Sequence, residues 1–199
     1  MRSEIVGRPL RSHVLFVANH LSWLDILLLA GATGSAFVSK AEVARYPLIG
    51  WLARLNRTIF VARAERGAVR GQVDAVRSTL ATGQPVALFP EGTTAGGDEV
   101  LPFRASLFAS LYPPSPDIRV QPVAIDYGKA ASDIAWVGDE PAKANALRIL
   151  RRKGHVPVRL YFLEPVDPAS IPDRKLLADA ARSEIVAALA PSSTLADAV

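Results

Sequence analysis

An apolar run from Val14 to Leu29 is interrupted by one histidine and one aspartate. Its first part, Val14 to Ala18, is typical of a fully buried strand, and the stretch from Trp23 to Ala30 is typical of an apolar helix. Ser22, with Asp25 three residues later, matches a helix N-cap followed by an acidic residue in the first turn. The sequence therefore predicts a buried strand that passes through a short loop into a helix.

The histidine and the aspartate of this run, His20 and Asp25, can meet in one arrangement. On a continuous helix their side chains would be separated by roughly 140°, so contact requires His20 to lie in the loop and fold back over the first turn. The carboxylate would then fix the imidazole tautomer and leave the other ring nitrogen free to take a proton from a hydroxyl group. The alternative is that Asp25 caps the helix and His20 is a core histidine.

Three further blocks follow this run. They are Arg57 to Arg63 (RTIFVAR), Phe89 to Thr93 (FPEGT) and Val120 to Ile125 (VQPVAI). With Asn19 to Asp25 (NHLSWLD), their order and spacing resemble the glycerolipid acyltransferase family, which includes lysophosphatidate acyltransferase (1-acylglycerol-3-phosphate O-acyltransferase). Arg57 stands where the family has a glycine.

The resemblance implies a role for matched residues of the first two blocks. His20 is expected to be the catalytic base, and Asp25 is expected to orient it. In the second block, Phe60 and Arg63 match residues that bind substrate. A guanidinium presents a planar fork to two phosphate oxygens, so Arg63 is expected to hold the phosphate of a lysophospholipid.

The third block, which follows the predicted strand Val86 to Phe89, contributes Glu91, Gly92 and Thr93 to the expected substrate site. A glycine permits close approach of the backbone to a ligand, and amides exposed in such a turn can face an anion. Glu91 could accept hydrogen bonds from substrate hydroxyls or brace the histidine loop. It is not assigned as the base, because a carboxylate with an ordinary pKa is a poor proton acceptor for an alcohol.

The function implied by the resemblance is O-acyl transfer. A fatty acyl group would move from acyl-CoA or acyl-carrier protein to the free hydroxyl of a lysophospholipid, most directly lysophosphatidate to phosphatidate. Lyso-ornithine lipid or another lysolipid is an alternative acceptor. Two alternatives belong to other classes: a thioesterase with water as the acceptor, and a peripheral lipid-binding protein without turnover. We expect no cofactor beyond the thioester co-substrate and no metal site.

The fold expected is a single α/β domain, because 199 residues with 50% hydrophobic content can bury a substantial core. The domain should span residues 14–189, after a lead-in over 1–13 and before a flexible tail over 190–199. A mixed sheet with surrounding helices should bring His20, Arg63 and Glu91 to one edge. Strands are expected at 35–39, 58–62, 86–89, 120–127 and 134–137 and, as an edge strand, at 156–162, and helices at 41–45, 48–55, 67–82, 143–153 and 173–189, with an apolar helix ending near Tyr112.

A membrane partner is expected at the surface of the protein. Residues 1–13 are polar and basic, far short of the roughly 20 apolar residues that a span requires, and the polar residues of the Val14 to Ala32 run are costly in lipid. The segment from Lys40 to Arg70 contains seven basic residues and only two acidic ones. Such a segment attracts anionic lipid, phosphorylated substrates or nucleic acid, and no nucleic-acid-binding motif accompanies it. With no secretory signal and no cysteine, we expect a peripheral protein on the cytoplasmic side of the cell membrane.

Overall fold

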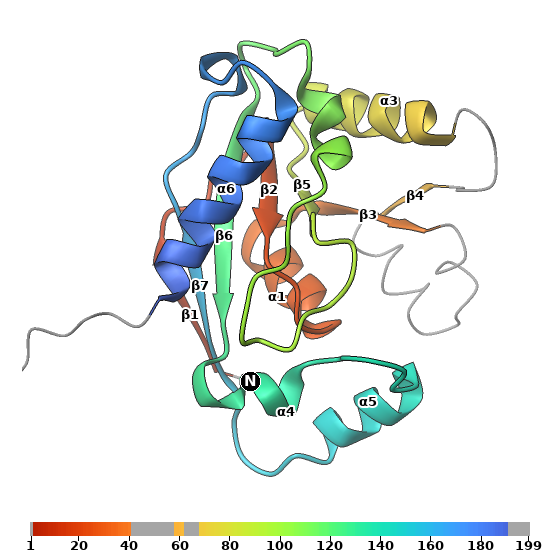
Figure 1. Ribbon diagram of the computed structural model, residues 1–199, viewed down its shortest axis with the longest axis vertical. Coiled ribbons are helices and arrows are strands. Elements are labelled where there is room, and N and C mark those ends of the chain that lie inside the picture. The colour runs from red at the N-terminus through yellow and green to blue at the C-terminus, as the bar shows by residue number, and fades with distance from the viewer. Residues whose placement is uncertain (1, 41–57, 62–67, 191–199) are drawn as a thin grey trace, which may run out of the picture.

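The computed structural model describes residues 2–40, 58–61 and 68–190, which form one seven-stranded sheet with helices on both faces (Figure 1). The strand order is β1-β7-β6-β2-β5-β3-β4, and every neighbouring pair is parallel except β6 and β7. The expected α/β fold with a mixed sheet is therefore confirmed. The strands are β1 (Arg2–Gly7), β2 (Val14–Ala18), β3 (Ala36–Lys40), β4 (Ile59–Val61), β5 (Val86–Leu88), β6 (Arg119–Asp126) and β7 (Pro157–Phe162).

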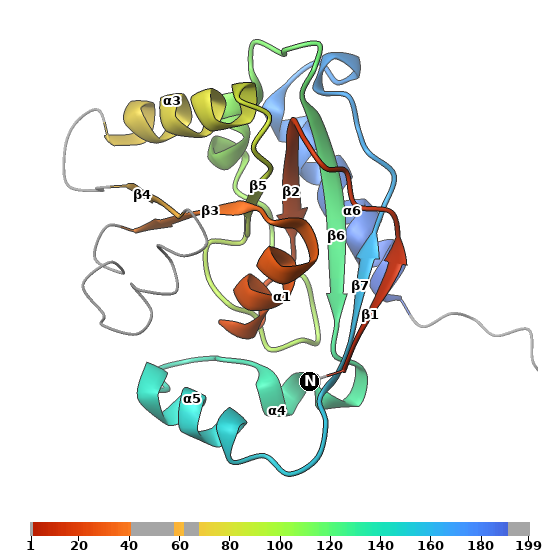
Figure 2. The ribbon, with the colours of Figure 1, turned by 180° about the vertical axis from the view of Figure 1, so that it is seen from behind.

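The helices connect these strands and cover the sheet. The α-helices are α1 (Leu24–Thr33), α3 (Ala68–Ala81), α4 (Ala131–Ile134), α5 (Ala142–Leu150) and α6 (Arg174–Leu189), and the 3-10 helices are η2 (Ala105–Leu111), η3 (Gly128–Ala130) and η4 (Pro168–Ser170). Helix α6 lies in front of the sheet in Figure 1, and the view from behind in Figure 2 shows α1 on the opposite face. The predicted helices over 67–82, 143–153 and 173–189 are confirmed, with small shifts at their ends.

The central strand β2 is buried along its whole length because both faces of the sheet are covered. Phe16 packs in one apolar cluster together with Leu29 of α1. Leu15 and Val17 pack in a second cluster, which includes residues of α3 and α6. Alternate side chains of a strand point to opposite faces, so β2 serves two cores and is fixed in position by both.

One strand was predicted correctly but placed wrongly in the sheet, and another predicted strand was wrong: the strand expected at 156–162 is β7 (Pro157–Phe162), but it is not at the edge. Val156 to Phe162 was expected to be an edge strand, but β1 pairs with β7 along its length, from Arg2 with Pro157 to Gly7 with Phe162. The six residues of β1, RSEIVG, are exposed, and their sequence does not alternate between apolar and polar residues. The sequence therefore contains no pattern that would identify this strand. The edge strand thus begins at Arg2, inside the segment that precedes β2.

The second error concerns Ile134 to Val137, which was expected to be a short strand. Ile134 is instead the last residue of α4, and the chain then runs irregularly past Trp136. A brief apolar run fits a helix end as well as a strand, and Ile134 and Ala135 are buried here by packing. The apolar helix expected to end near Tyr112 is the 3-10 helix η2. The two short helices expected at 41–45 and 48–55, and most of the predicted tail, lie outside the described residues.

The expected strands at 35–39, 58–62, 86–89 and 120–127 correspond to β3, β4, β5 and β6. Strands β2, β5, β3 and β4 run parallel to one another, so their carboxyl ends lie at the same edge of the sheet. Among the described residues, none of the helices reaches the length and apolarity that a bilayer crossing requires.

Candidate active site

Two loops meet at the carboxyl ends of the neighbouring strands β2 and β5. The first carries His20 after β2, and the second carries Glu91 after β5. In open α/β sheets this edge is where ligands bind. The loops face η3 and α4, which follow β6 at the lower end of the sheet in Figure 1.

His20 lies in the loop before α1 and meets Asp25 as the sequence predicted. Its ring donates from Nδ1 to Asp25 Oδ2 over 2.9 Å. The same carboxylate oxygen accepts the backbone N–H groups of Leu21 at 2.7 Å and Ser22 at 2.8 Å. Asp25 therefore holds the imidazole and the loop backbone at once. The expected N-cap at Ser22 was wrong, because the N-cap of α1 is Trp23 and no side-chain hydrogen bond caps the helix.

The other oxygen of this carboxylate has a partner that sequence reasoning missed. The Tyr127 hydroxyl donates to Asp25 Oδ1 over 2.6 Å, and both side chains are buried. Burial, together with the negative charge of Asp25, raises the pKa of Tyr127, so the phenol remains a proton donor. The signal available in the sequence was a tyrosine directly after the strand of the VQPVAI block.

Glu91 braces the histidine loop. It is 3% exposed, and its Oε1 accepts the backbone N–H of His20 over 2.8 Å. Its Oε2 accepts the backbone N–H of Leu101 over 3.0 Å. Burial raises the pKa of Glu91, while the two backbone donors act in the opposite direction. Of the two roles considered for Glu91, the structure shows the bracing contact.

Phe89 covers one face of the His20 imidazole. Its ring stacks on the His20 imidazole with centroids 4.0 Å apart and planes inclined by 14°. Nδ1 is committed to Asp25, so Nε2 is the ring nitrogen left for a substrate, and the side chain is 17% exposed. A ring held on one face and at one nitrogen presents the other nitrogen in a fixed direction.

The loop around His20 is fixed to its neighbours by further hydrogen bonds. The side chain of Asn19 pairs with both backbone groups of Ile125 on β6, at 2.8 and 3.0 Å. Ala95 donates to the His20 carbonyl at 2.7 Å, and Trp136 donates to the Leu21 carbonyl at 2.8 Å. The segment after β5 and the segment after α4 thus both hold the histidine loop in place.

The turn after Glu91 needs a glycine. Gly92 has φ +73°, and a Cβ at this position would lie 2.8 Å from Cζ of Arg104. The glycine therefore permits a left-handed turn and lets the Arg104 guanidinium lie against it. Thr93 is exposed beside them. Sequence reasoning gave Arg104 no role, although it lies between the third and fourth blocks of the family resemblance.

The residues of the second block are placed in part. Phe60 is in β4, where it pairs with Ser39 of β3, and its side chain is not described. Arg63 lies outside the described residues, so the expected meeting of His20, Arg63 and Glu91 is confirmed for His20 and Glu91. Among the residues described, no group of three or more His, Cys, Asp or Glu side chains could hold a metal ion.

Comparison with known proteins relates this geometry to a family. The acyltransferase family model matches residues 3–126, which include His20, Asp25 and Glu91. The chain is also similar to a crystal structure of the 1-acyl-sn-glycerophosphate acyltransferase PlsC from Thermotoga maritima, with a TM-score of 0.62 and 26% identity over 96% of this chain and 75% of that one.

Three curated relatives extend the comparison. A lyso-ornithine lipid O-acyltransferase of Rhodobacter capsulatus is 35% identical over 93% of this chain and 69% of its own length. A lyso-ornithine lipid O-acyltransferase of Pseudomonas aeruginosa is 37% identical over 96% of this chain and 75% of its own length. A 1-acyl-sn-glycerol-3-phosphate acyltransferase of Neisseria meningitidis is 33% identical over 96% of this chain and 76% of its own length. The chain belongs to the acyltransferase family and is an O-acyltransferase.

Proposed function

We propose that this enzyme transfers an acyl group from a thioester to the free hydroxyl of a lysolipid, with His20 as the general base. The observation that carries the proposal is the 2.9 Å contact between His20 Nδ1 and Asp25 Oδ2. It commits one ring nitrogen to a buried carboxylate and leaves Nε2 to receive the hydroxyl proton. The carboxylate stabilises the imidazolium that forms.

In the proposed reaction, His20 Nε2 takes the hydroxyl proton as the acceptor oxygen attacks the thioester carbonyl carbon. The tetrahedral intermediate then collapses, the carbon–sulfur bond breaks, and the imidazolium returns its proton to the departing thiolate. The products are an ester and a free thiol, and no acyl-enzyme forms. The negative charge of the intermediate needs N–H donors. The Gly92 N–H already donates to the Phe89 carbonyl, so the Arg104 guanidinium, which lies against Gly92, is the donor proposed for this role.

Two acceptors have specific support. Lyso-ornithine lipid comes first, because four relatives with that activity in their names are 35–40% identical to this chain. Lysophosphatidate comes second, supported by the relative from Neisseria meningitidis and by the structural similarity to PlsC. For lysophosphatidate, Arg63, Phe60 and Thr93 stay predicted substrate contacts. The donor is acyl-CoA or acyl-carrier protein, and the enzyme acts as a peripheral protein at the cytoplasmic face of an anionic membrane.

The test is thiol release from acyl-CoA and, in a second series, from acylated acyl-carrier protein, measured together with the acylated product. The unaltered enzyme, His20→Ala and the control His155→Ala, which removes an exposed histidine, are each assayed without acceptor, with lyso-ornithine lipid and with lysophosphatidate. We expect release that requires an acceptor and His20 and survives His155→Ala. Release without acceptor would identify a thioesterase. Release that survives His20→Ala would refute the base assignment, and no release with either acceptor and either donor would favour the lipid-binding alternative.

A further inference from the structure

Helix α5 has one face turned into the protein and one face turned outward. Asn145 and Ile149 are buried on its inner face. Leu147 and Leu150 are 38% and 72% exposed. At 100° per residue, Leu147 and Leu150 share an outer stripe with Lys143 and Arg151. Two leucines are thus presented to the outside between two cations.

The charged residues of the segment that carries this stripe all have one sign. From Pro141 to Val156 the chain has five Lys and Arg residues and no carboxylate. Two of the five are neutralised by ion pairs, Arg148 with Glu140 and Arg152 with Asp133. The other three, Lys143, Arg151 and Lys153, are exposed and make no ion pair with any described residue.

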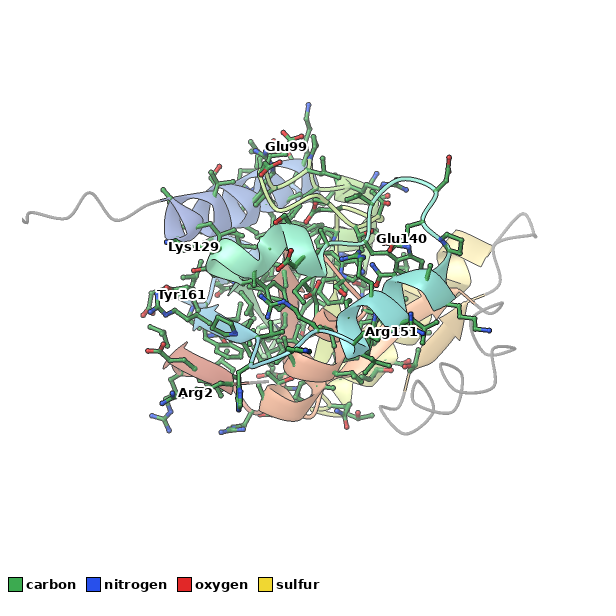
Figure 3. The ribbon with its side chains drawn as sticks, turned by 90° about the horizontal axis from the view of Figure 1, so that it is seen from below. Arg2, Glu99, Lys129, Glu140, Arg151 and Tyr161 are labelled. Carbon is green, nitrogen blue, oxygen red and sulfur yellow. The ribbon has the colours of Figure 1, made fainter. Side chains whose placement is uncertain are left out.

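The outer face of α5 lies at the same end of the molecule as the active site. Trp23, at the start of α1, donates from Nε1 to the Asn145 side chain over 3.1 Å, and Trp136 donates to the Leu21 carbonyl over 2.8 Å. The segment from α4 to α5 is therefore attached directly to the loop that carries His20. Figure 3 looks onto this end, where α4 and α5 lie in front of the sheet and Arg151 marks the end of α5.

We propose that the outer face of α5, with Lys143, Leu147, Leu150 and Arg151, is a docking surface for an anionic lipid bilayer, together with Lys153 just after the helix. The inference deepens the proposed function, on which it rests, by naming the surface through which the enzyme meets its lipid substrates. Leucines would enter the boundary between headgroups and acyl chains while the flanking cations contact lipid phosphates. Docking there would hold the His20 loop close to the bilayer surface.

Two other occupants fit these residues less well. Nucleic acid is bound through its phosphates, which would use the cations but leave a leucine that is 72% exposed without a partner. In a symmetric dimer through this face, the same surface meets itself, so Lys143, Arg151 and Lys153 would face their own copies, and like charges across an interface oppose association. An anionic bilayer complements the leucines and the cations together.

The test measures binding of the whole chain to vesicles that contain phosphatidylglycerol and to vesicles of phosphatidylcholine alone. We expect binding to the anionic vesicles that weakens at high salt, since exposed charges are screened. Leu147→Gln with Leu150→Gln should lower the vesicle partition coefficient by about tenfold or more, and glutamine has a similar helix propensity. The triple change Lys143→Gln, Arg151→Gln and Lys153→Gln should lower it by a similar factor at low salt.

The matched control is Leu176→Gln, which replaces a leucine of α6 that is 49% exposed. Binding by the Leu147/Leu150 variant as tight as that of the unaltered protein would overturn the proposal, and so would an equal loss with Leu176→Gln or no binding to anionic vesicles. Tighter binding to a DNA duplex than to vesicles would assign the stripe to nucleic acid. A dimer that the Leu147/Leu150 variant converts to monomer would assign it to a second copy, and either result would refute bilayer docking.

A second assay separates this inference from the proposed function. Each variant is given acyl-CoA and a short-chain lysolipid at a concentration at which the lysolipid is monomeric. We expect the α5 variants to match the unaltered enzyme in this assay and to lose activity when the acceptor is embedded in anionic vesicles. If no protein transfers acyl groups to either acceptor, the proposed function fails, while the vesicle partition coefficients still decide the role of α5.

Discussion

Tyr127 and Asp25 are joined by a hydrogen bond of 2.6 Å from the phenol hydroxyl to Oδ1. Asp25 uses its other oxygen for His20 and for two backbone N–H groups. Each carboxylate oxygen therefore has a defined set of donors, and the aspartate cannot turn without breaking several bonds. Because Tyr127 directly follows β6, this neighbour of β2 helps to set the orientation of the histidine that follows β2.

The first prediction removes this hydroxyl. Tyr127→Phe keeps the ring in the core but removes the hydrogen bond that Asp25 Oδ1 accepts. We expect kcat to fall about tenfold or more while KM stays the same, because a bond to a charged acceptor is worth about 1.5–3 kcal/mol. Steady-state kinetics with a lysolipid acceptor gives both constants. Tyr112→Phe is the matched control, since it removes a hydroxyl that donates to the Ile171 carbonyl, away from His20. Equal kcat values for Tyr127→Phe and the unaltered enzyme would exclude a positioning role.

The second prediction concerns the carboxylate that holds the imidazole. Asp25→Asn replaces one carboxylate oxygen by an NH2 group, which cannot accept a hydrogen bond. Depending on which oxygen is replaced, either the Tyr127 hydroxyl or the three donors at Oδ2 lose their acceptor. The negative charge opposite His20 is lost as well, so we expect kcat to fall by about a hundredfold or more. Asp74→Asn, which changes an exposed carboxylate of α3, should leave kcat unchanged. A loss below threefold for Asp25→Asn would refute the proposed pairing as a catalytic device.

The third prediction uses the raised pKa of Glu91, which burial causes. A carboxyl group with a higher pKa in the folded protein binds more protons there than in the unfolded chain. Its contribution to stability is therefore largest at low pH and declines as pH rises above about 4.5 toward the folded-state pKa. Glu91→Gln does not titrate. Urea unfolding at pH 5 and at pH 7.5 should show the stability of the unaltered protein declining relative to that of Glu91→Gln over this interval.

Glu91→Gln also tests the bracing contact. Glutamine has one side-chain oxygen, so it can accept from the backbone N–H of His20 or of Leu101 but turns a donor toward the other. We expect kcat to fall about tenfold, because a bond to a charged acceptor is worth about 1.5–3 kcal/mol. Glu99→Gln, an exposed change eight residues further along the chain, is the control. A rise in KM with kcat intact would instead indicate that Glu91 acts through substrate binding.

The fourth prediction concerns Asn145, a fully buried side chain of α5 that accepts from Trp23 and donates to Glu140. Asn145→Ala would leave the Trp23 indole N–H without its acceptor, and we expect a loss of about 2–3 kcal/mol in the free energy of unfolding. Lys143→Ala, on the exposed side of the same helix, should change it by less than about 0.5 kcal/mol. Thermal and urea unfolding measure both. Similar free energies of unfolding for the two variants would show that the hydrogen bond between Trp23 and Asn145 contributes little to stability.

The sequence by itself determined the elements that local pattern controls. The apolar block of β2, the helical spacing of α3 and the helix expected over 173–189 depend on residues close together in the chain. It also determined that His20 must lie in a loop to meet Asp25, because helix geometry forbids the contact otherwise. The carboxyl ends of β2 and β5 were expected at one edge of the sheet for a similarly general reason.

Tertiary structure alone decided the partners that come from distant parts of the chain. Tyr127 is separated by about a hundred residues from the Asp25 that it contacts, and the polar strand β1 takes its place because β7 offers a free edge. The exposed stripe of α5 follows from which of its faces packs inward. Burial of a given side chain depends on what the rest of the fold lays against it, and no local pattern encodes that packing.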